Sequence, residues 1–477
     1  MKWQKGLCGI FLFVLLLAEE SALPALAQSA SVTTSATSGT KAATDNTKKE
    51  TPAKEDSLEA WFNATKNPVD WFSWGMDMRV REEYHNNALT LNGSVPNHEY
   101  NYQRYRTRIW ESFKPNDHFS INSRLTWEWR DFSKPIALRD INLDEVIVDA
   151  LNVKWKEIGG EPLALTFGRQ DICLGNGWLV MEGTPLDGSR TFFFDAARIN
   201  YEAKELKTLF DLIYVDQAAD SDHWFEPFYE RERYLIENDE RGLILYASNK
   251  SIIPQSHWDE YFIYKHDRRV LANGDNADIF VPGTLIEGNL DEHWKYSAEM
   301  APQVGQKNGR KLLAYGFTGC VSYFVNDPLN NNFRLGYEYL SGDDPSSGTN
   351  GAFDPLWGRW PLWTDLLGFT YARETKVQEL TNLHRPHVGW SFNPWKPIEI
   401  VVDYDLLFAD ENTRRGSAGF SDTGKERGQF VSTYLKYKFT EHLSGWLQAE
   451  YFFPGDYYSP SMGDMATFFR YQLVLKW

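Results

Sequence analysis

Cysteine and long hydrophobic runs are both scarce in this chain of 477 residues. It has 3 cysteines. Cys8 lies in the N-terminal apolar run, which leaves Cys173 and Cys320, too few for a disulfide framework, and whether these two pair stays open. A membrane-spanning helix needs about 20 consecutive apolar residues, and the only long apolar run lies at the N-terminus. The sequence therefore excludes a bundle of transmembrane helices.

Motifs for catalysis or cofactor binding are also lacking. The sequence has no Gly-x-Ser-x-Gly elbow, no phosphate-binding loop that ends in Gly-Lys-Ser/Thr, no His-Glu-x-x-His and no Cys-x-x-Cys. Its 10 histidines are scattered and have no carboxylate or thiol at a spacing that suits a metal ion. We therefore predict no catalytic residues, no metal site and no cofactor.

The N-terminus has the composition of a secretory signal. In residues 1–27, lysines lead the apolar stretch 6–18, and the small residues of a cleavage site follow at 25–27. Residues 28–70 are rich in Ser, Thr, Ala and Lys, and have too few large apolar side chains to offset the entropy of ordering. We expect an exported protein in which residues 28–70 form a flexible periplasmic segment.

From about residue 76 onward, apolar and polar residues alternate. The clearest examples are 119–130, 398–408 and 443–453. A period of two places the apolar side chains on one face of a β-strand and the polar side chains on the other. A soluble β-sandwich has the same alternation, so the period alone does not place the chain in a membrane.

Further features favour a membrane barrel. Many alternating segments exceed the 5 or 6 residues of typical sandwich strands and reach the ~9–11 residues that a tilted membrane strand needs. Trp127, Trp129, Trp155 and Trp477 have apolar parity near predicted strand ends, where an interfacial girdle lies. The last segment, 467–477, alternates and ends in an aromatic residue, which resembles the terminal strand and assembly signal of bacterial outer-membrane barrels.

The connections between the predicted strands alternate in length. Residues 71–477 therefore predict a transmembrane antiparallel β-barrel of about 18 strands, with short periplasmic turns and long extracellular loops in strict alternation. The short turns are predicted at 114–118, 157–162, 202–207, 288–292, 325–331, 394–397 and 440–441, and the long loops at 85–99, 132–145, 170–194, 217–240, 341–381, 409–428 and 454–465.

Arginines supply the clearest candidate site. Arg104, Arg106 and Arg108 alternate with neutral residues, and an arginine that faces lipid at the membrane midplane costs about 2–4 kcal/mol, so we expect all three to point into the lumen. Arg169 shares the parity of its apolar neighbours and points inward only if Gly168 marks a bulge or the strand has left the membrane. The same parity argument predicts lumen-facing Arg124, Arg130, Arg198, Arg334 and Arg470.

Two roles for these arginines stay open. Planar, always-charged groups can form a substrate pathway that selects carboxylates or phosphates. Alternatively, the arginines brace the wall by pairing with inward acids on neighbouring strands, and both roles can hold together. The formal net charge of −17 falls largely in predicted outer loops such as 217–240, which surround the pore. The candidate bracing acids are Glu128, Glu338, Asp403, Asp405 and Glu450.

Several short segments resemble the alginate export family of outer-membrane porins. The resemblance covers about residue 75 to the end. It implies an 18-stranded barrel with an arginine-rich lumen for an anionic polysaccharide, gated by loops, of which 170–194 and 341–381 are the candidates for folding inward. The segments are Leu165-Thr166-Phe167-Gly168-Arg169-Gln170, Gly175-Asn176-Gly177, Gly188-Ser189-Arg190-Thr191-Phe192, Phe194-Asp195-Ala196-Ala197-Arg198, Tyr296-Ser297-Ala298-Glu299 with Gln303 and Gly305, Tyr337-Glu338-Tyr339-Leu340-Ser341-Gly342-Asp343, and Phe453-Pro454-Gly455.

The sequence thus favours a porin of the bacterial outer membrane that is not an enzyme. We predict passive passage of anionic oligo- or polysaccharide, such as an alginate-like polyuronate, or of small anionic solutes. The alternatives are a general or cation-selective porin, a β-barrel hydrolase or deacylase, and a secreted carbohydrate-binding protein. Expected partners are outer-membrane lipid and the barrel assembly machinery, which would bind the strand ending in Trp477. No nucleic acid is expected.

Overall fold

The computed structural model describes residues 57–135, 146–182, 193–220, 223–225, 228, 234 and 236–477. The predicted signal peptide and residues 28–56 lie outside these described residues. Among the described residues, no helix is both long and apolar enough to cross a membrane.

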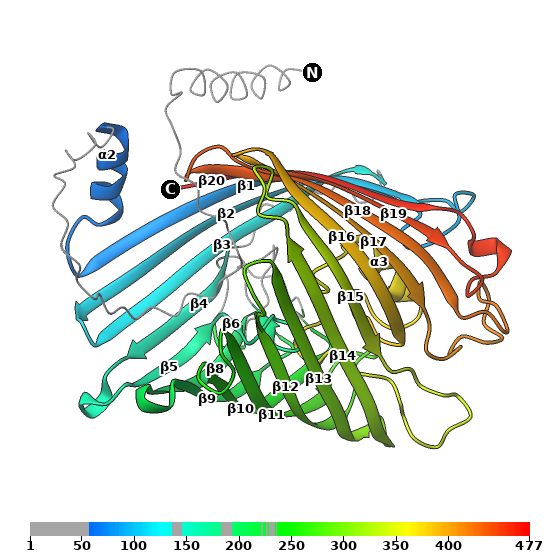
Figure 1. Cartoon of the computed structure of the whole chain (residues 1–477), viewed down its shortest axis with the longest axis horizontal. Coiled ribbons are helices and arrows are strands. Elements are labelled where there is room, and N and C mark those ends of the chain that lie inside the picture. Colours follow the sequence, from blue (N-terminus) through cyan, green and yellow to red (C-terminus); the bar gives the residue numbers. More distant parts are fainter. Residues whose placement is uncertain are drawn as a thin grey trace. The chain divides into compact units, whose positions relative to one another are not determined.

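The described chain forms an 18-stranded antiparallel barrel in which consecutive strands pair around the wall (Figure 1). The last strand pairs with the first, from Asp77 opposite Lys476 to Asn86 opposite Thr467, and this closes the barrel. The predicted strand number is therefore confirmed. The strands are β1 (Phe72–Asn86), β2 (Glu99–Asn116), β3 (Phe119–Lys134), β4 (Val146–Trp155), β5 (Leu163–Gln170), β8 (Phe194–Ala203), β9 (Thr208–Gln217), β10 (Asn238–Asn249), β11 (Ser256–Arg269), β12 (Ala277–Asn289), β13 (Trp294–Lys307), β14 (Arg310–Phe324), β15 (Asn332–Leu340), β16 (Leu383–Trp395), β17 (Ile398–Phe408), β18 (Glu426–Lys438), β19 (Leu443–Pro454) and β20 (Ala466–Lys476).

Shorter elements lie in the connections. The strands β6 (Ile172–Cys173) and β7 (Met181–Glu182) form a small hairpin between β5 and β8, and helix α3 (Leu366–Thr370) lies between β15 and β16. Short 3-10 turns follow α3 at Tyr371–Arg373 and lie elsewhere at Ile158–Gly160, Lys204–Leu206 and Pro460–Met462. Cys173 and Cys320 are free thiols.

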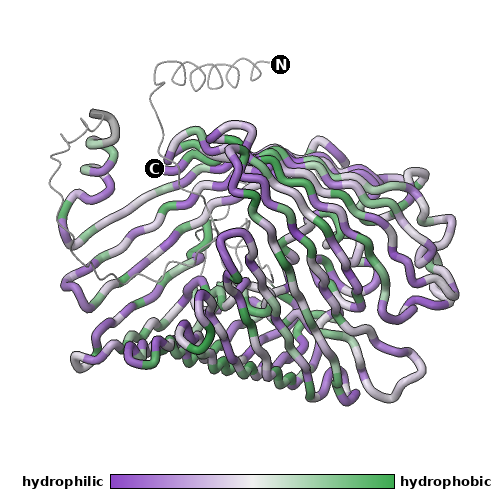
Figure 2. Tube along the Cα trace, viewed as in Figure 1, coloured by the Kyte–Doolittle hydropathy of each residue, from purple (hydrophilic) through white to green (hydrophobic). Residues whose placement is uncertain are grey.

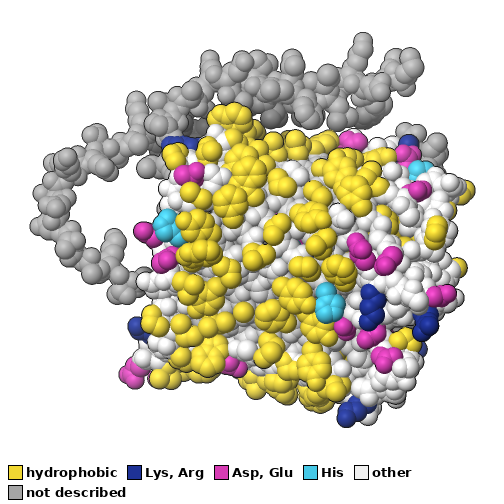
Figure 3. Space-filling model, turned by 45° about the vertical axis from the view of Figure 1, so that its right-hand side comes forward, with side chains coloured by type: hydrophobic (Ala, Val, Ile, Leu, Met, Phe, Trp, Pro, Cys, Tyr) yellow, Lys and Arg dark blue, Asp and Glu magenta, His cyan; other side chains and the backbone are white. Residues whose placement is uncertain are grey.

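Along many strands, such as β1 and β9 to β11, more buried and more exposed side chains alternate. Hydrophilic and hydrophobic residues also alternate along much of the chain trace (Figure 2). On β1, for example, Arg79 and Arg81 are 1% and 0% exposed, whereas outward Met78 is 41% exposed. Hydrophobic side chains cover much of the face seen in Figure 3, and charged side chains are sparse within that cover. An apolar outer belt around a polar interior is the arrangement that a lipid bilayer requires of a barrel.

The prediction of tryptophans near strand ends holds for two of the four residues named. Trp155 ends β4 and is half-exposed, and Trp477 directly follows β20. Trp127 and Trp129 instead lie in the middle of β3, where their rings contact each other at a centroid distance of 4.4 Å. Their predicted place near a strand end was wrong because β3 runs on through Lys134, well beyond the alternation that the sequence shows.

The prediction of strict alternation between short and long connections was wrong at two places. The end of the barrel opposite the termini carries the long connections, but it also carries the short connection 270–276 and a two-residue turn at Asn308-Gly309. Both turn residues have positive φ, 52° and 78°, as a type I′ hairpin requires. The turn between β10 and β11, at 250–255, was not predicted.

Helix α2 (Ser57–Lys66) lies near the end of the segment 28–70 that the sequence predicts to be flexible. Its Trp61 stacks on Trp477, with ring centroids 5.9 Å apart, and its Phe62 meets the same indole edge-on at 5.5 Å. The indole of Trp74 donates a hydrogen bond to the carbonyl of Thr65 at 2.8 Å. Aromatic contacts with the barrel therefore order residues that have little burial of their own.

Candidate functional site

The candidate site is the lumen, and its most densely charged part is the inner surface of β20, β1, β2 and β3, here called the basic wall. Arg104 and Arg106 of β2 are buried, and Arg108 is partly exposed to the lumen. Arg106 lies directly opposite Arg79 of β1, and Arg104 directly opposite Arg81. Like charges directly across a strand pair repel each other, so this wall needs carboxylates to hold it together.

Carboxylates on the same strands bridge these arginines. Glu83 accepts an ion pair from Arg470 at 2.8 Å and from Arg104 at 3.3 Å, and Glu128 contacts Arg104 at 3.3 Å and Arg79 at 3.4 Å. The ion pairs that the bracing interpretation expects at Glu128 are therefore present. The inward charges of the basic wall include Arg79, Arg81, Arg104, Arg106, Arg108, Arg124, Arg130 and Arg470 against Asp77, Glu83 and Glu128, so positive charge is in excess.

Arg124 and Arg130 both lie on the inner face of β3 but differ in their contacts. Arg124 binds Asp149 at 2.8 Å and Asp171 at 2.7 Å. Arg130 is exposed to the lumen, and its guanidinium lies 5.6 Å from the ring centre of Tyr102. Within the described residues, Arg130 has no ion pair, so it is the arginine of this wall most available to a passing anion.

The remaining predicted arginines lie away from the basic wall. Arg169 is buried and forms a fork-like pair with Asp195 at 3.0 and 3.1 Å, and Gly168 before it has a φ of 112°. This departure from extended backbone turns Arg169 inward. It matches the prediction that Arg169 can face the lumen only if the strand is irregular at Gly168. Arg198 and Arg334 are partly exposed and pair with Asp211 at 2.7 Å and Asp403 at 2.8 Å respectively.

The sequence prediction missed buried arginines that also point into the lumen and form ion pairs there. Arg79 and Arg81 lie on β1, where the same alternation with Met78 and Val80 was present in the sequence. Arg385 pairs with Glu338 at 2.9 Å and with Asp405 at 2.7 Å. Parity on β1 could have revealed the first two, whereas Pro386 and His387 interrupt the alternation around Arg385.

Across the barrel, the inner surface of β9 to β13 is mainly acidic and is here called the acidic wall. Lys265 pairs with Glu240 at 2.9 Å and with Asp267 at 3.2 Å. Asp259 and Glu299 accept hydrogen bonds from Tyr246 and Tyr261, and no lysine or arginine of the described residues contacts either carboxylate. The other buried charges of this wall are Asp211 and Lys307.

Loop 341–382, between β15 and β16, crosses the lumen between these two walls. On one side, Asp365 binds Arg470 at 2.8 Å, and the backbone amide of Leu366 donates to Glu450 at 2.8 Å. On the other side, Asp354 binds Lys307 at 2.7 Å, and the indole of Trp357 donates to Glu240 at 2.9 Å. The side chains of Leu356 and Trp357 are 0% and 2% exposed. The prediction that this loop folds inward is confirmed.

The loop that carries β6 and β7 also folds inward over its described part. Val180 forms a parallel β-bridge with Trp357, and the amide of Trp357 donates to the carbonyl of Leu179 at 3.0 Å. Glu450, one of the candidate bracing acids, accepts hydrogen bonds from the backbone amides of Asp365 and Leu366 in loop 341–382. It forms no ion pair with an arginine among the described residues. The two inward loops pack on each other and narrow the lumen.

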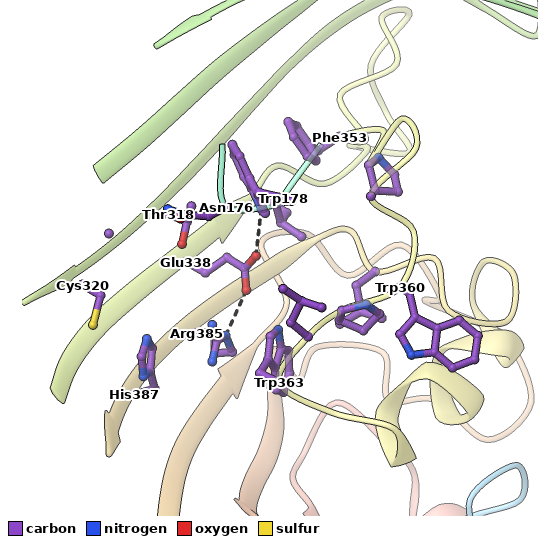
Figure 4. Close-up of a pocket in the computed structure, with 18 of the residues that line it drawn as sticks. Asn176, Trp178, Thr318, Cys320, Glu338, Phe353, Trp360, Trp363, Arg385 and His387 are labelled. Atoms are coloured by element: carbon purple, nitrogen blue, oxygen red, sulfur yellow. Dashed lines mark hydrogen bonds and ion pairs between the residues drawn. The ribbon is translucent and has the colours of Figure 1, made fainter. Parts of the chain in front are cut away.

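A cavity of about 310 Å³ remains between these loops and the inner surface of β14, β15 and β16 (Figure 4). Glu338 lies at its centre, between Trp178 above and Arg385 below, and accepts a hydrogen bond from each. Trp360 and Trp363 line the side that loop 341–382 provides. The aromatic segment 354–363 therefore does two things: Trp357 packs against the wall, while Trp360 and Trp363 border open space.

Two carboxyl groups in connections between strands have shifted pKa values: Asp275, which pairs with Lys376 of loop 341–382, and Asp354 of that loop. Burial alone would raise the pKa of Asp275, in the connection between β11 and β12, but Lys307 and Lys376 lower it from 3.8 to about 2. Burial would also raise the pKa of Asp354, but Lys307 and Lys265 outweigh burial and lower the pKa of this carboxyl group below its ordinary value. Both carboxylates are therefore charged, and their ion pairs are intact, at neutral pH.

Comparison with solved structures shows the same fold at low sequence identity. OccAB2 of Acinetobacter baumannii has 8% identity and a TM-score of 0.54, with 85% of this chain and 98% of that chain covered. The outer membrane protein OpdK of Pseudomonas aeruginosa has 12% identity and a TM-score of 0.52, with 85% and 99% covered, and OpdQ of the same organism has 11% and 0.54, with 85% and 98% covered. A search of curated proteins found no match.

A model of the alginate export family matches residues 70–472, which is most of the chain and the whole barrel except its last residues. Family and fold agree on a closed barrel of the bacterial outer membrane through which solutes pass, and not on an enzyme. The chain belongs to the alginate export family of outer-membrane channels.

Proposed function

We propose that this channel carries anionic saccharides or small anionic solutes passively, along the basic wall. The excess of inward arginines over carboxylates on β20, β1, β2 and β3 carries this proposal. A guanidinium offers a carboxylate two parallel hydrogen bonds. Arg130, which has no ion pair within the described residues, and the partly exposed Arg108 and Arg124 are the groups that such a ligand would meet.

The alginate export family of this chain supports a polyuronate as the anionic cargo. A solved OpdK structure holds vanillate, so a small aromatic carboxylate is the model for the small-solute form of the same proposal. Because loop 341–382 narrows the lumen, passage of a polymer requires the loop to move aside, whereas a small anion has a smaller cross-section to fit.

A cation-selective porin is the second candidate, and the acidic wall favours it. Asp259 and Glu299 have no lysine or arginine partner among the described residues, so they attract cations to the side opposite the arginines. In this alternative the arginines only brace the barrel.

The reversal potential across a salt gradient separates the two candidates. The purified protein is placed in a planar bilayer, and polyuronate is then added to one side. Anion-selective current that polyuronate blocks is the expected result. Cation-selective current that polyuronate does not block would mean that the acidic wall, and not the basic wall, selects the ions.

The ends of the chain complete the proposal. Residues 1–27 act as a cleaved signal peptide, and the segment that follows up to residue 70 lies in the periplasm. The strand that ends in Trp477 is the segment that the barrel assembly machinery would bind. N-terminal sequencing of protein purified from membranes tests the cleavage, with Gln28 expected as the first residue.

A further inference from the structure

The cavity beside Glu338 combines aromatic surface with polar groups that have no hydrogen-bond partner among the described residues. Trp178 and Phe353 stack on each other, with ring centroids 5.4 Å apart and planes at 19°. The guanidinium of Arg385 lies 4.2 Å from the ring centre of Trp363. Trp360 makes no ring contact with any described residue. These contacts fix the positions of Trp178, Phe353 and Trp363. Trp363 is the indole of loop 341–382 that lies beside Glu338 and Arg385, whereas the indole of Trp360 extends away from them (Figure 4).

The polar groups at the cavity are of two kinds. The hydroxyl of Thr318 and the imidazole of His387 line it and make no hydrogen bond within the described residues. The imidazole fits there because residue 336 is glycine: a Cβ at Gly336 would lie 2.1 Å from the His387 ring nitrogen Nε2. Both groups can donate to, or accept from, the hydroxyl groups of a ligand.

The charged groups at the cavity are fully occupied with each other. Glu338 accepts from the Trp178 indole at 3.1 Å through one carboxylate oxygen and from Arg385 at 2.9 Å through the other. Arg385 also donates to Asp405 at 2.7 Å. A ligand carboxylate would therefore find no uncompensated cation at these residues, unlike at Arg130 on the basic wall.

We propose that this cavity is a subsite for one saccharide ring, recognised by stacking and neutral hydrogen bonds and not by charge. A pyranose ring has an apolar C–H face for an indole and hydroxyl groups for Thr318 and His387. The volume of about 310 Å³ lies at the lower end of small-molecule sites, which begin at ~300 Å³. The inference deepens the proposed saccharide channel and rests on it: the basic wall guides charge, and this cavity binds the ring.

Calorimetric titration of the full-length protein in detergent tests the subsite. The probes are maltotriose as a neutral trisaccharide, trigalacturonate as an acidic one, and benzamide as a planar neutral molecule without hydroxyl groups. We expect maltotriose to bind, trigalacturonate to bind at least as tightly because it can also use the basic wall, and benzamide to bind far more weakly. Binding of trigalacturonate alone would overturn recognition without charge, benzamide binding as tight as that of maltotriose would overturn recognition of hydroxyl groups, and no binding at all would remove the subsite.

Variants localise the binding. Trp363→Ala and Thr318→Val should each weaken the binding of maltotriose about tenfold, or about 1.4 kcal/mol. Trp395→Ala, at an exposed turn far along β16, should leave that binding unchanged. Thr318→Val keeps the shape of the side chain, so it tests the site even where the tryptophan variant fails to fold, which gel mobility before and after boiling reveals. Unchanged affinity in both variants would contradict the assignment. Because no current is measured, this result and the reversal potential can fail separately.

Discussion

The two walls of the lumen differ in how their charges are held. On the basic wall, arginines lie directly opposite arginines, and Asp77, Glu83 and Glu128 bridge them. On the acidic wall, Asp259 and Glu299 are held by tyrosine hydroxyl groups without any lysine or arginine among the described residues. The first wall is a cross-linked ionic lattice, and the second holds two buried carboxyl groups that no lysine or arginine of the described residues contacts. Structural bracing and ion selectivity can therefore be separated by changing one wall at a time.

Removal of most of loop 341–382, which connects the two walls, should have the largest effect, and that effect is on the conductance of the channel. Replacing residues 345–379 with a short Gly-Ser linker removes Leu356 and Trp357 from the lumen together with the ion pairs of Asp354 and Asp365. We expect the single-channel conductance to rise several-fold, since an 18-stranded barrel is wide enough for an aqueous channel and, of the two inward loops, only the one that carries β6 and β7 would remain. Shortening loop 409–425 is the control and should change conductance little. Equal conductance in both variants would mean that loop 341–382 does not limit flow.

Changes on the two walls should shift selectivity in opposite directions. The triple variant Arg104→Gln, Arg106→Gln and Arg108→Gln should move the reversal potential toward cations. The double variant Asp259→Asn and Glu299→Gln should move it toward anions, because each removes charge of one sign from one side of the lumen. Reversal potentials under the same salt gradient give both results. A shift in the same direction would disprove the division into walls.

The same two variants should differ in stability. The arginine variant removes both arginine partners of the buried Asp77 and an arginine partner from each of Glu83 and Glu128, and breaking a buried ion pair costs about 3–5 kcal/mol. The acidic-wall variant breaks no contact with a lysine or arginine. We expect the temperature at which the barrel loses its faster gel mobility to fall in the first variant only. A matching fall in both would show that the tyrosine contacts brace the barrel as firmly as the arginines do.

A single arginine separates selectivity from bracing more finely. Arg130→Gln removes a lumen-exposed charge that has no ion pair within the described residues. The stability should stay within about 0.5 kcal/mol of the parent, while the anion preference falls by part of the triple-variant effect. Arg106→Gln is the matched control, because Arg106 is buried and pairs with Asp77. It should lower the stability of the barrel more than Arg130→Gln does. If Arg130→Gln leaves the reversal potential unchanged, exposed arginines are not the filter.

Acid should produce the smallest change. Because the pKa of Asp275 is lowered to about 2, its ion pairs with Lys307 and Lys376 contribute stability above the unfolded value near 3.8, and this is lost as pH falls through about 2. Conductance should therefore be insensitive to these pairs from pH 8 to about pH 5 and rise below about pH 4 as the loop loosens. Asp275→Asn should remove this acid-dependent part, and a conductance step near pH 6 would point to other groups.

The wall of the barrel was predictable because its signal is local. Alternation fixes which face of a strand meets lipid, so β1 to β20 and the inward direction of Arg104, Arg106 and Arg108 follow from parity. The connection lengths failed at Asn308-Gly309, where a tight hairpin needs only two residues of positive φ. The girdle failed at Trp127 because the length of β3 is set by its pairing with β2, which no local pattern gives.

Sequence alone thus determined the class of the molecule, its strand number and the charged character of its lumen, because each of these depends on neighbours along the chain. Tertiary structure decided which arginines are compensated, since the partners of Arg470 are Glu83 and Asp365, more than a hundred positions away in sequence. It also decided that loop 341–382 joins the two walls and leaves a cavity beside Glu338. Such contacts between distant segments exist only once the barrel has closed, and no pattern along the chain encodes them.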